Sequence, residues 1–176
     1  MRKWTLREKK KLIVVLILAA LGALFGYIET LIPPVFGSLA HLRVQLGVIL
    51  ALFALLAYGP LEALMVYGVR SVAYGLICDD GYAILLEITA FAVAAVAVWG
   101  VMKARKVGAG THGAVAGAAY AVVYTALGCI LPRSGAMWQT LLQTMAFYAV
   151  NMGVLGVAAW VALRYLPERL IFDNLE

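Results

Sequence analysis

Six apolar segments, each close to the length of a membrane helix, make up most of the chain and constrain its fold more than any other feature. Hydrophobic residues fill 65% of the 176 positions and charged residues only 13%, whereas about a quarter of the residues in soluble domains are charged. The segments are too long and too numerous for one soluble core. The sequence therefore predicts an all-α integral membrane protein with one polytopic domain over residues 1–176.

Prolines, glycines and charged residues mark the ends of the segments. The predicted spans cover approximately residues 12–32, 44–58, 61–77, 82–102, 112–131 and 137–163. Two of them, 44–58 and 61–77, are short for a hydrocarbon layer about 30 Å thick. We expect this pair to be tucked into the bundle or joined by a tight turn at Gly59–Pro60. The predicted fold is a bundle of six transmembrane helices.

Lysines and arginines fall mostly on one side of the six predicted spans. That side holds Arg2, Lys3, Arg7, Lys9, Lys10, Lys11, Lys103, Arg105, Lys106, Arg164 and Arg169. The other side has only Arg43 and Arg133. The positive-inside rule then places both termini in the cytoplasm, and we expect the protein in a bacterial plasma (inner) membrane. Topology accounts for the basic residues, so we predict no nucleic-acid partner.

Ionisable residues inside the predicted spans are the clearest functional signal. Arg70 lies in the middle of one span, Glu29 near the outer end of the first and Glu87 just inside the fourth. At a helical rise of about 1.5 Å per residue, all three lie roughly 6–10 Å below the outer ends of their spans. Ionisable groups at membrane depth are rare unless they pair or face a polar cavity. We therefore expect these side chains to lie close together.

Two interpretations of this set remain open. In one, Arg70 pairs with Glu87 or Glu29 and locks three helices together. In the other, an outward-facing pocket uses its excess of acids to hold a cationic group, while Arg70 or Arg43 binds a ligand carboxylate or phosphate through two parallel hydrogen bonds. The same charges would serve both purposes if they pair in the empty state. The candidate ligand-binding residues are Glu29, Arg43, Arg70, Tyr74, Asp79, Asp80, Glu87 and Asn151.

Small residues repeat at intervals of four in the first span. Ala19 and Ala23 form one such pair, and Gly22 and Gly26 form another. Residues at this spacing share a helix face, and small side chains let a second helix approach closely. The stripe predicts either close packing within this chain or contact with a partner subunit.

Several short runs in the first half of the chain resemble one family. In chain order they are Tyr27–Pro34 (YIETLIPP), Val44–Gly47 (VQLG), Tyr58–Leu64 (YGPLEAL) and Val69–Ser71 (VRS). These runs resemble the Gx transporter family, whose members carry the label heptaprenyl diphosphate synthase component I. That family is similar to the substrate-binding S-components of energy-coupling factor (ECF) transporters.

The resemblance implies a six-helix fold with a binding site open to the outside. It implies that Ala19 and Ala23 dock onto the transmembrane coupling subunit, and that separate ATPase subunits hydrolyse ATP. By the same resemblance, Glu29, Arg70 and neighbours from the outer loops line the pocket. Segment 37–43 and the Asp79–Asp80 pair depart from the family pattern in the presumed ligand loops. The resemblance therefore does not identify the ligand.

We predict a membrane-embedded substrate-binding subunit for uptake of a small polar nutrient. The alternative is a membrane subunit of an electron-transfer system partnered with a flavin-bearing extracellular protein, because relatives resemble components that act beside such proteins. An enzyme acting on a lipid, with Asp79, Asp80 and Glu87 as metal ligands, is disfavoured because these acids lie on the outer side. The chain has no GxxxxGK[ST] nucleotide-binding motif and no Cys/His spacing typical of metal sites. We therefore predict no enzymatic activity, no cofactor and no metal.

Overall fold

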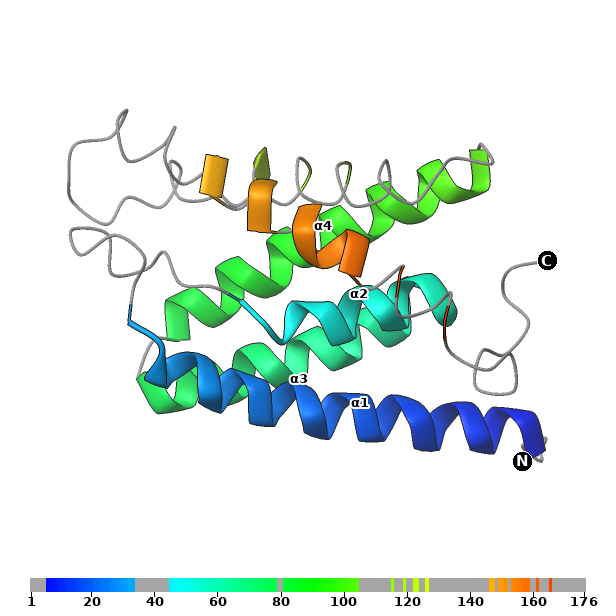
Figure 1. Ribbon diagram of the computed structural model, residues 1–176, viewed down its shortest axis with the longest axis horizontal. Coiled ribbons are helices and arrows are strands. Elements are labelled where there is room, and N and C mark those ends of the chain that lie inside the picture. Colours follow the sequence, from blue (N-terminus) through cyan, green and yellow to red (C-terminus); the bar gives the residue numbers. More distant parts are fainter. Residues whose placement is uncertain are drawn as a thin grey trace.

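The computed structural model is helical throughout the part of the chain that it describes (Figure 1). The described residues are 6–33, 45–78 and 81–104, together with 115, 119, 122, 123, 126, 146, 147, 149–151, 153–158, 161 and 165. The continuous part forms the helices α1 (Leu6–Leu31), α2 (Val48–Ala57), α3 (Pro60–Cys78) and α4 (Gly81–Ala104). No strand occurs within these residues.

Three of these helices are long and apolar enough to cross a membrane. The spanning segments are Glu8–Leu31, Pro60–Cys78 and Ile84–Val101, which agree with the predicted spans 12–32, 61–77 and 82–102. Helix α1 begins six residues before the predicted span because its first residues, LREKKK, are types that favour helix. Most of the predicted spans 112–131 and 137–163 lies outside the described residues.

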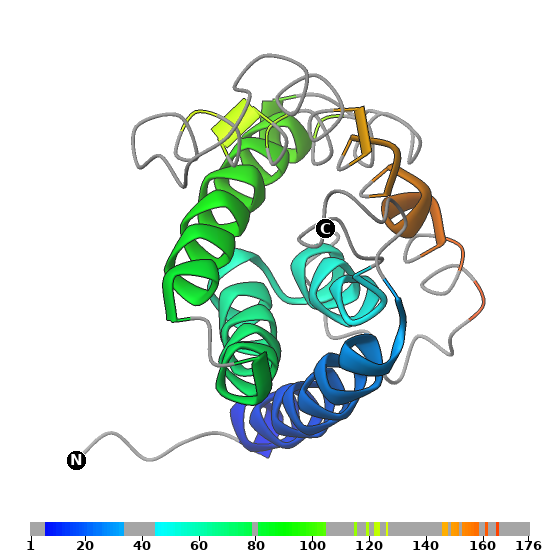
Figure 2. The ribbon, with the colours of Figure 1, turned by 90° about the vertical axis from the view of Figure 1, so that its left-hand side faces the viewer.

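Helix α2 is too short for the span predicted at 44–58. Its ten residues rise about 15 Å, half of a hydrocarbon layer. Figure 2 looks along the helices and shows α2 enclosed by α1, α3, α4 and the described residues near 150. The buried residues of α2 are Val48, Ala51, Leu52, Ala54, Leu55, Leu56 and Ala57. A helix that is apolar on all sides belongs in a core, which is the position expected for a span tucked into the bundle.

A tight turn reverses the chain between α2 and α3. The N–H groups of Tyr58 and Gly59 donate to the carbonyl oxygen of Ala54 at 2.8 and 3.1 Å. Gly59 has φ of +117°, a conformation that residues with a Cβ rarely adopt. Pro60 begins α3, where its missing N–H would have had no helical partner. This confirms the predicted turn, and Figure 1 shows the two helices running in opposite directions.

Helices α1 and α3 run in the same direction and pack closely. The inward side of α1 carries the buried residues Val15, Ala19, Gly22, Gly26 and Glu29. A Cβ added to Gly26 would lie 2.8 Å from the carbonyl oxygen of Arg70, and one added to Gly22 would lie 3.3 Å from that of Val66. The glycines therefore let α1 approach the backbone of α3 directly, as small residues do between membrane helices.

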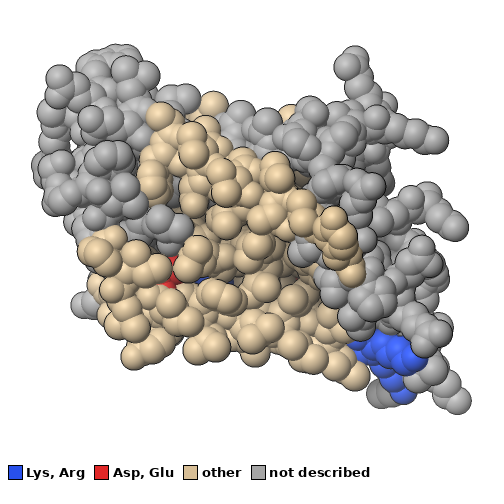
Figure 3. All heavy atoms as spheres, in the orientation of Figure 1, with Lys and Arg blue, Asp and Glu red and all other residues tan. Residues whose placement is uncertain are grey.

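The outward sides of the long helices expose large apolar side chains. They include Ile13, Leu16, Ile17, Leu24 and Leu31 on α1, Leu61 and Leu76 on α3, and Leu85 and Val96 on α4. In Figure 3 this flank is almost free of charge, and lysine and arginine gather at the beginning of α1. At that end Lys11 Nζ contacts Glu62 Oε1 at 2.6 Å. Soluble monomers rarely expose continuous apolar surface of this extent.

Candidate functional site

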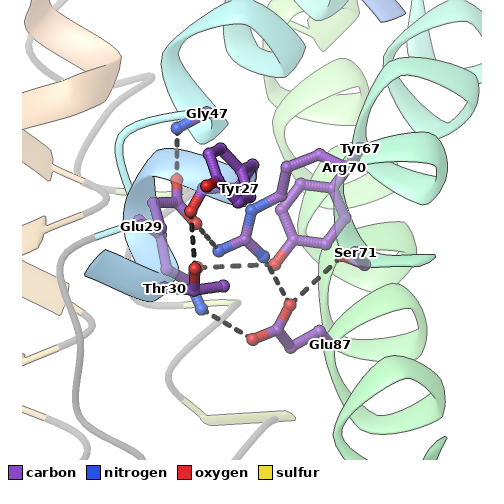
Figure 4. Close-up of polar contacts among 9 residues, drawn as sticks. Tyr27, Glu29, Thr30, Gly47, Tyr67, Arg70, Ser71 and Glu87 are labelled. Atoms are coloured by element: carbon purple, nitrogen blue, oxygen red, sulfur yellow. Dashed lines mark hydrogen bonds and ion pairs between the residues drawn. The ribbon is translucent and has the colours of Figure 1, made fainter. Parts of the chain in front are cut away.

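Arg70 lies at the centre of a buried polar cluster contributed by α1, α3, α4 and the segment before α2 (Figure 4). Its Nη2 group donates to Glu29 Oε2, and its Nη1 group donates to Glu87 Oε2 at 2.5 Å. The exposed fractions of Arg70, Glu29 and Glu87 are 1%, 0% and 5%. One guanidinium group therefore joins three helices. The structure shows Arg70 paired with both carboxylates at once.

Further donors fill the remaining positions on both carboxylates. Glu29 Oε1 accepts a hydrogen bond from the backbone N–H of Gly47 at 2.6 Å. Glu87 Oε1 accepts from Gln45 Nε2 at 3.1 Å, and Glu87 Oε2 also accepts from Ser71 Oγ at 3.2 Å. Each of the four carboxylate oxygens therefore faces at least one donor. An ionised carboxylate, which only accepts hydrogen bonds, is the form that suits these neighbours.

Two aromatic rings lie close to the guanidinium group. The Cζ atom of Arg70 is 5.5 Å from the ring centroid of Tyr67 and 5.3 Å from that of Tyr74. The Tyr67 ring stacks on Phe91 with centroids 4.0 Å apart, and its hydroxyl donates to Gln45 Oε1 at 3.4 Å. Cation–π contact of this kind stabilises a buried cation. The rings also restrict the directions in which Arg70 can move.

The chain matches no protein-family model, no curated protein and no solved structure. Its function must therefore be inferred from its own residues.

Of the predicted ligand-binding residues, Glu29, Arg70, Tyr74 and Glu87 come together in the cluster. Arg43, Asp79 and Asp80 lie outside the described residues. Asn151 is partly buried, and its Nδ2 atom has no hydrogen-bond acceptor among the described residues. No contact links Asn151 to Arg70 within the described part of the chain.

The role of Arg70 as an anchor for a ligand anion stays a prediction, because the structure shows only the paired arrangement of its side chain. Both terminal nitrogens of its side chain already donate to carboxylates, so in this structure the group does not offer two parallel donors to a second anion. Its Nε atom differs, because it is buried and has no acceptor among the described residues. One donor of the guanidinium group therefore remains unused by the neighbours that the structure describes.

The list of predicted ligand-binding residues does not contain four members of the cluster. Tyr67 and Ser71 lie three residues before and one residue after Arg70 on α3, and the spacing from Tyr67 to Tyr74 was the signal that could have found Tyr67. Gln45 and Gly47 belong to the VQLG run that carries the family resemblance. A Cβ on Gly47 would lie only 3.0 Å from Arg70 Cγ and 3.3 Å from Glu29 Oε1. The glycine is needed so that its N–H can reach the carboxylate.

The proposed partner stripe lies partly inside the protein. Ala19 is 7% exposed and packs in the core, whereas Ala23 is partly buried. Packing within the chain, one of the two interpretations of this stripe, therefore accounts for Ala19. A coupling subunit that docks on α1 would find more surface on the apolar side chains that flank the stripe, such as Leu16 and Leu24.

Proposed function

We propose that the protein is a membrane-embedded substrate-binding subunit, similar to the S-components of ECF transporters, for uptake of a small polar nutrient. The observation that carries the proposal is the Glu29–Arg70–Glu87 cluster, in which three helices bury a guanidinium group and two carboxylates within an apolar bundle. Ionisable groups at such positions in membrane proteins mark binding sites and transport pathways.

A purely structural role explains this cluster less well. Replacing a buried ion pair by apolar residues is often neutral or stabilising, so a buried pair is weak evidence that its purpose is stability. The apolar packing of glycines against α3 already holds α1 in place. In the protein without ligand, the ion pairs instead give each of the three charged groups a partner. A ligand that competes for these partners would shift the equilibrium toward a second arrangement.

The positions of the ends of α1 and α4 support a binding site nearer the outer face of the membrane. The beginning of α1, which carries Lys9, Lys10 and Lys11, and the end of α4, which includes Lys103, lie at the same end of the bundle (Figure 1). The cluster lies nearer the opposite end, because Glu29 is close to the end of α1 and Glu87 close to the beginning of α4. With the basic end in the cytoplasm, the pocket opens outward, and separate coupling and ATPase subunits would drive uptake.

A thermal-shift screen of the detergent-purified protein against vitamins, amino acids, nucleobases and flavins tests the proposal. We expect a ligand that stabilises the wild type and has no effect on Arg70→Ala. Ser71→Ala provides a milder variant, since it removes one hydrogen bond to Glu87 and leaves all charges in place. It should fold and bind the same ligand more weakly.

Absence of any saturable binding would contradict the proposed function. If Arg70→Ala were merely unstable and no compound stabilised the wild type, the cluster would be a structural lock. Flavin absorbance retained by the purified protein would instead favour the electron-transfer alternative.

A further inference from the structure

The buried cluster carries more negative than positive charge. The described residues contribute two carboxylates, Glu29 and Glu87, and one guanidinium group, Arg70. One net negative charge therefore remains among these groups when both carboxylates are ionised. Among the described residues, the other side chains that bond to these carboxylates, Gln45 and Ser71, are neutral, and so are the tyrosine rings beside Arg70.

Most of the groups that contact the two carboxylates are hydrogen-bond donors. A proton on either oxygen of Glu29 would point at a donor, the N–H of Gly47 or the guanidinium group. A proton on Glu87 Oε2 would face Arg70 and a hydroxyl group. Glu87 Oε1 faces the side-chain amide of Gln45, which would present its oxygen instead of its nitrogen after a half-turn.

The excess charge belongs to Glu87 rather than to Glu29. Gly47, whose N–H binds Glu29, is the N-cap of α2. The beginning of a helix carries a partial positive charge that stabilises a nearby anion. Glu29 therefore has both Arg70 and the start of α2 as partners. Within the part of the chain that the structure describes, Glu87 shares Arg70 and otherwise faces the neutral donors Gln45 and Ser71. Glu87 is also the least buried of the three charged residues.

A second observation concerns the unused donor of Arg70. The Nε–H group is buried, since the Arg70 side chain is only 1% exposed, and it has no acceptor among the described residues. Buried donors are nearly always satisfied. With two carboxylates already in contact with this guanidinium group, the acceptor that suits Nε is a neutral oxygen or nitrogen rather than a third anion.

We propose that the ligand is a small molecule with a single positive charge and a neutral hydrogen-bond acceptor. The positive group, an amine or a cationic heterocycle, binds Glu87 Oε1 and the turned amide oxygen of Gln45, and the neutral acceptor accepts from Arg70 Nε. This inference rests on the proposed function, since it assigns the ligand class of the same site. An anionic ligand would bury a second uncompensated charge, which is strongly disfavoured.

The test compares ligand classes on the purified full-length protein at neutral pH. Thermal shift followed by titration calorimetry would use thiamine, choline and histamine as cationic probes. Nicotinamide, pyridoxine and uracil are the neutral probes, and nicotinate, pantothenate and orotate are the anionic ones. Each probe is measured on the wild type, on Glu87→Gln and on Glu62→Gln. The last variant is the matched control, because Glu62 pairs with Lys11 at the other end of the bundle.

We expect binding only among the cationic probes, weakened roughly a hundredfold or more in Glu87→Gln and unchanged in Glu62→Gln. If Glu87→Gln does not fold, Glu29→Gln is the second variant, because it also leaves the cluster with one carboxylate and one guanidinium group. An anionic probe that binds, or a cationic probe with equal affinity for wild type and Glu87→Gln, would overturn the inference and leave the proposed function standing. No binding in any class would refute the proposed function, and the inference with it.

Discussion

Removing the positive charge of the cluster should destabilise the protein far more than removing one of its negative charges. In Arg70→Gln, two buried carboxylates lose the guanidinium group that both of them contact. Removing one partner of a buried ion pair typically costs about 3–5 kcal/mol. Because a single group serves two carboxylates here, we expect a loss at the upper end, about 5 kcal/mol.

Glu87→Gln should be mild by comparison. The new side chain keeps a carbonyl oxygen for Arg70 and Ser71, and its amide would face Gln45. The Gln45 amide can turn to accept from it, and the hydroxyl of Tyr67 can then accept instead of donating. The change also removes the excess negative charge. We expect a loss of about 1 kcal/mol, the size of one hydrogen bond.

Thermal unfolding in one detergent, followed by tryptophan fluorescence, measures the difference. For a chain of this length, about 1 kcal/mol corresponds to a shift of roughly 2–4 °C. Arg70→Gln should therefore unfold roughly 10–20 °C below the wild type, and Glu87→Gln only a few degrees below it. In the double variant the losses should not add, because the second change relieves the charge that the first leaves unpaired.

Lys11→Gln is the control for loss of a cation from an ion pair. Its partner Glu62 and Lys11 itself are both partly exposed, and exposed pairs contribute about 0–1 kcal/mol. Equal unfolding temperatures for Arg70→Gln and Glu87→Gln would refute the idea that Arg70 is the only cation that balances the cluster. Such a result would point to a further positive group outside the described residues.

Three glycine substitutions make further predictions, each checked by the same unfolding measurement. Gly26→Ala should cost about 1–3 kcal/mol, because its Cβ would lie 2.8 Å from the backbone oxygen of Arg70. Gly68→Ala, where a Cβ meets nothing within 4 Å, should instead stabilise α3 by up to about 1 kcal/mol. Equal effects of Gly26→Ala and Gly68→Ala would argue against close packing of α1 on α3. Gly59→Ala should cost roughly 1–3 kcal/mol, since the residue has φ of +117°, and an unchanged unfolding temperature would show that the turn tolerates other conformations.

The sequence could predict that the three charged residues meet, because each residue of a helix adds a fixed rise and position along a span therefore gives its depth. Glu29 and Arg70 lie in the last turns of the parallel helices α1 and α3, and Glu87 lies in the second turn of α4, which runs the other way, so all three are near the same end of the bundle. The pairing of Arg70 with both carboxylates was not predictable, since spacing along a span does not specify which helix faces lie opposite each other. That choice depends on Gly22 and Gly26, which set how α1 rests on α3.

The length of α2 was harder to predict from the sequence. The run from Val44 to Tyr58 is almost uniformly apolar, so hydropathy alone does not show that helix begins only at Val48. The residues before it turn through hydrogen bonds such as Val48 N–H to the oxygen of Gln45, at 3.2 Å. Gln45 and Gly47 reach the cluster because this turn precedes the helix. A list of ionisable residues leaves both out, since neither has an ionisable side chain.

The shortness of α2 and the chemistry of the cluster have one physical explanation. A helix that began near the membrane surface would place Gln45 and Gly47 well above Arg70, with their backbone groups bonded within the helix. Because α2 begins only at Val48, the backbone N–H of Gly47 binds Glu29 and the side-chain amide of Gln45 reaches Glu87. Irregular backbone at membrane depth is tolerated where it is buried in protein or lines a cavity, and transporters bind ligands at the ends of such interrupted helices. The fold thus holds Glu29 against the start of α2, and in the binding mode that we propose Glu87, opposite Gln45, is the carboxylate that exchanges its partner for the ligand.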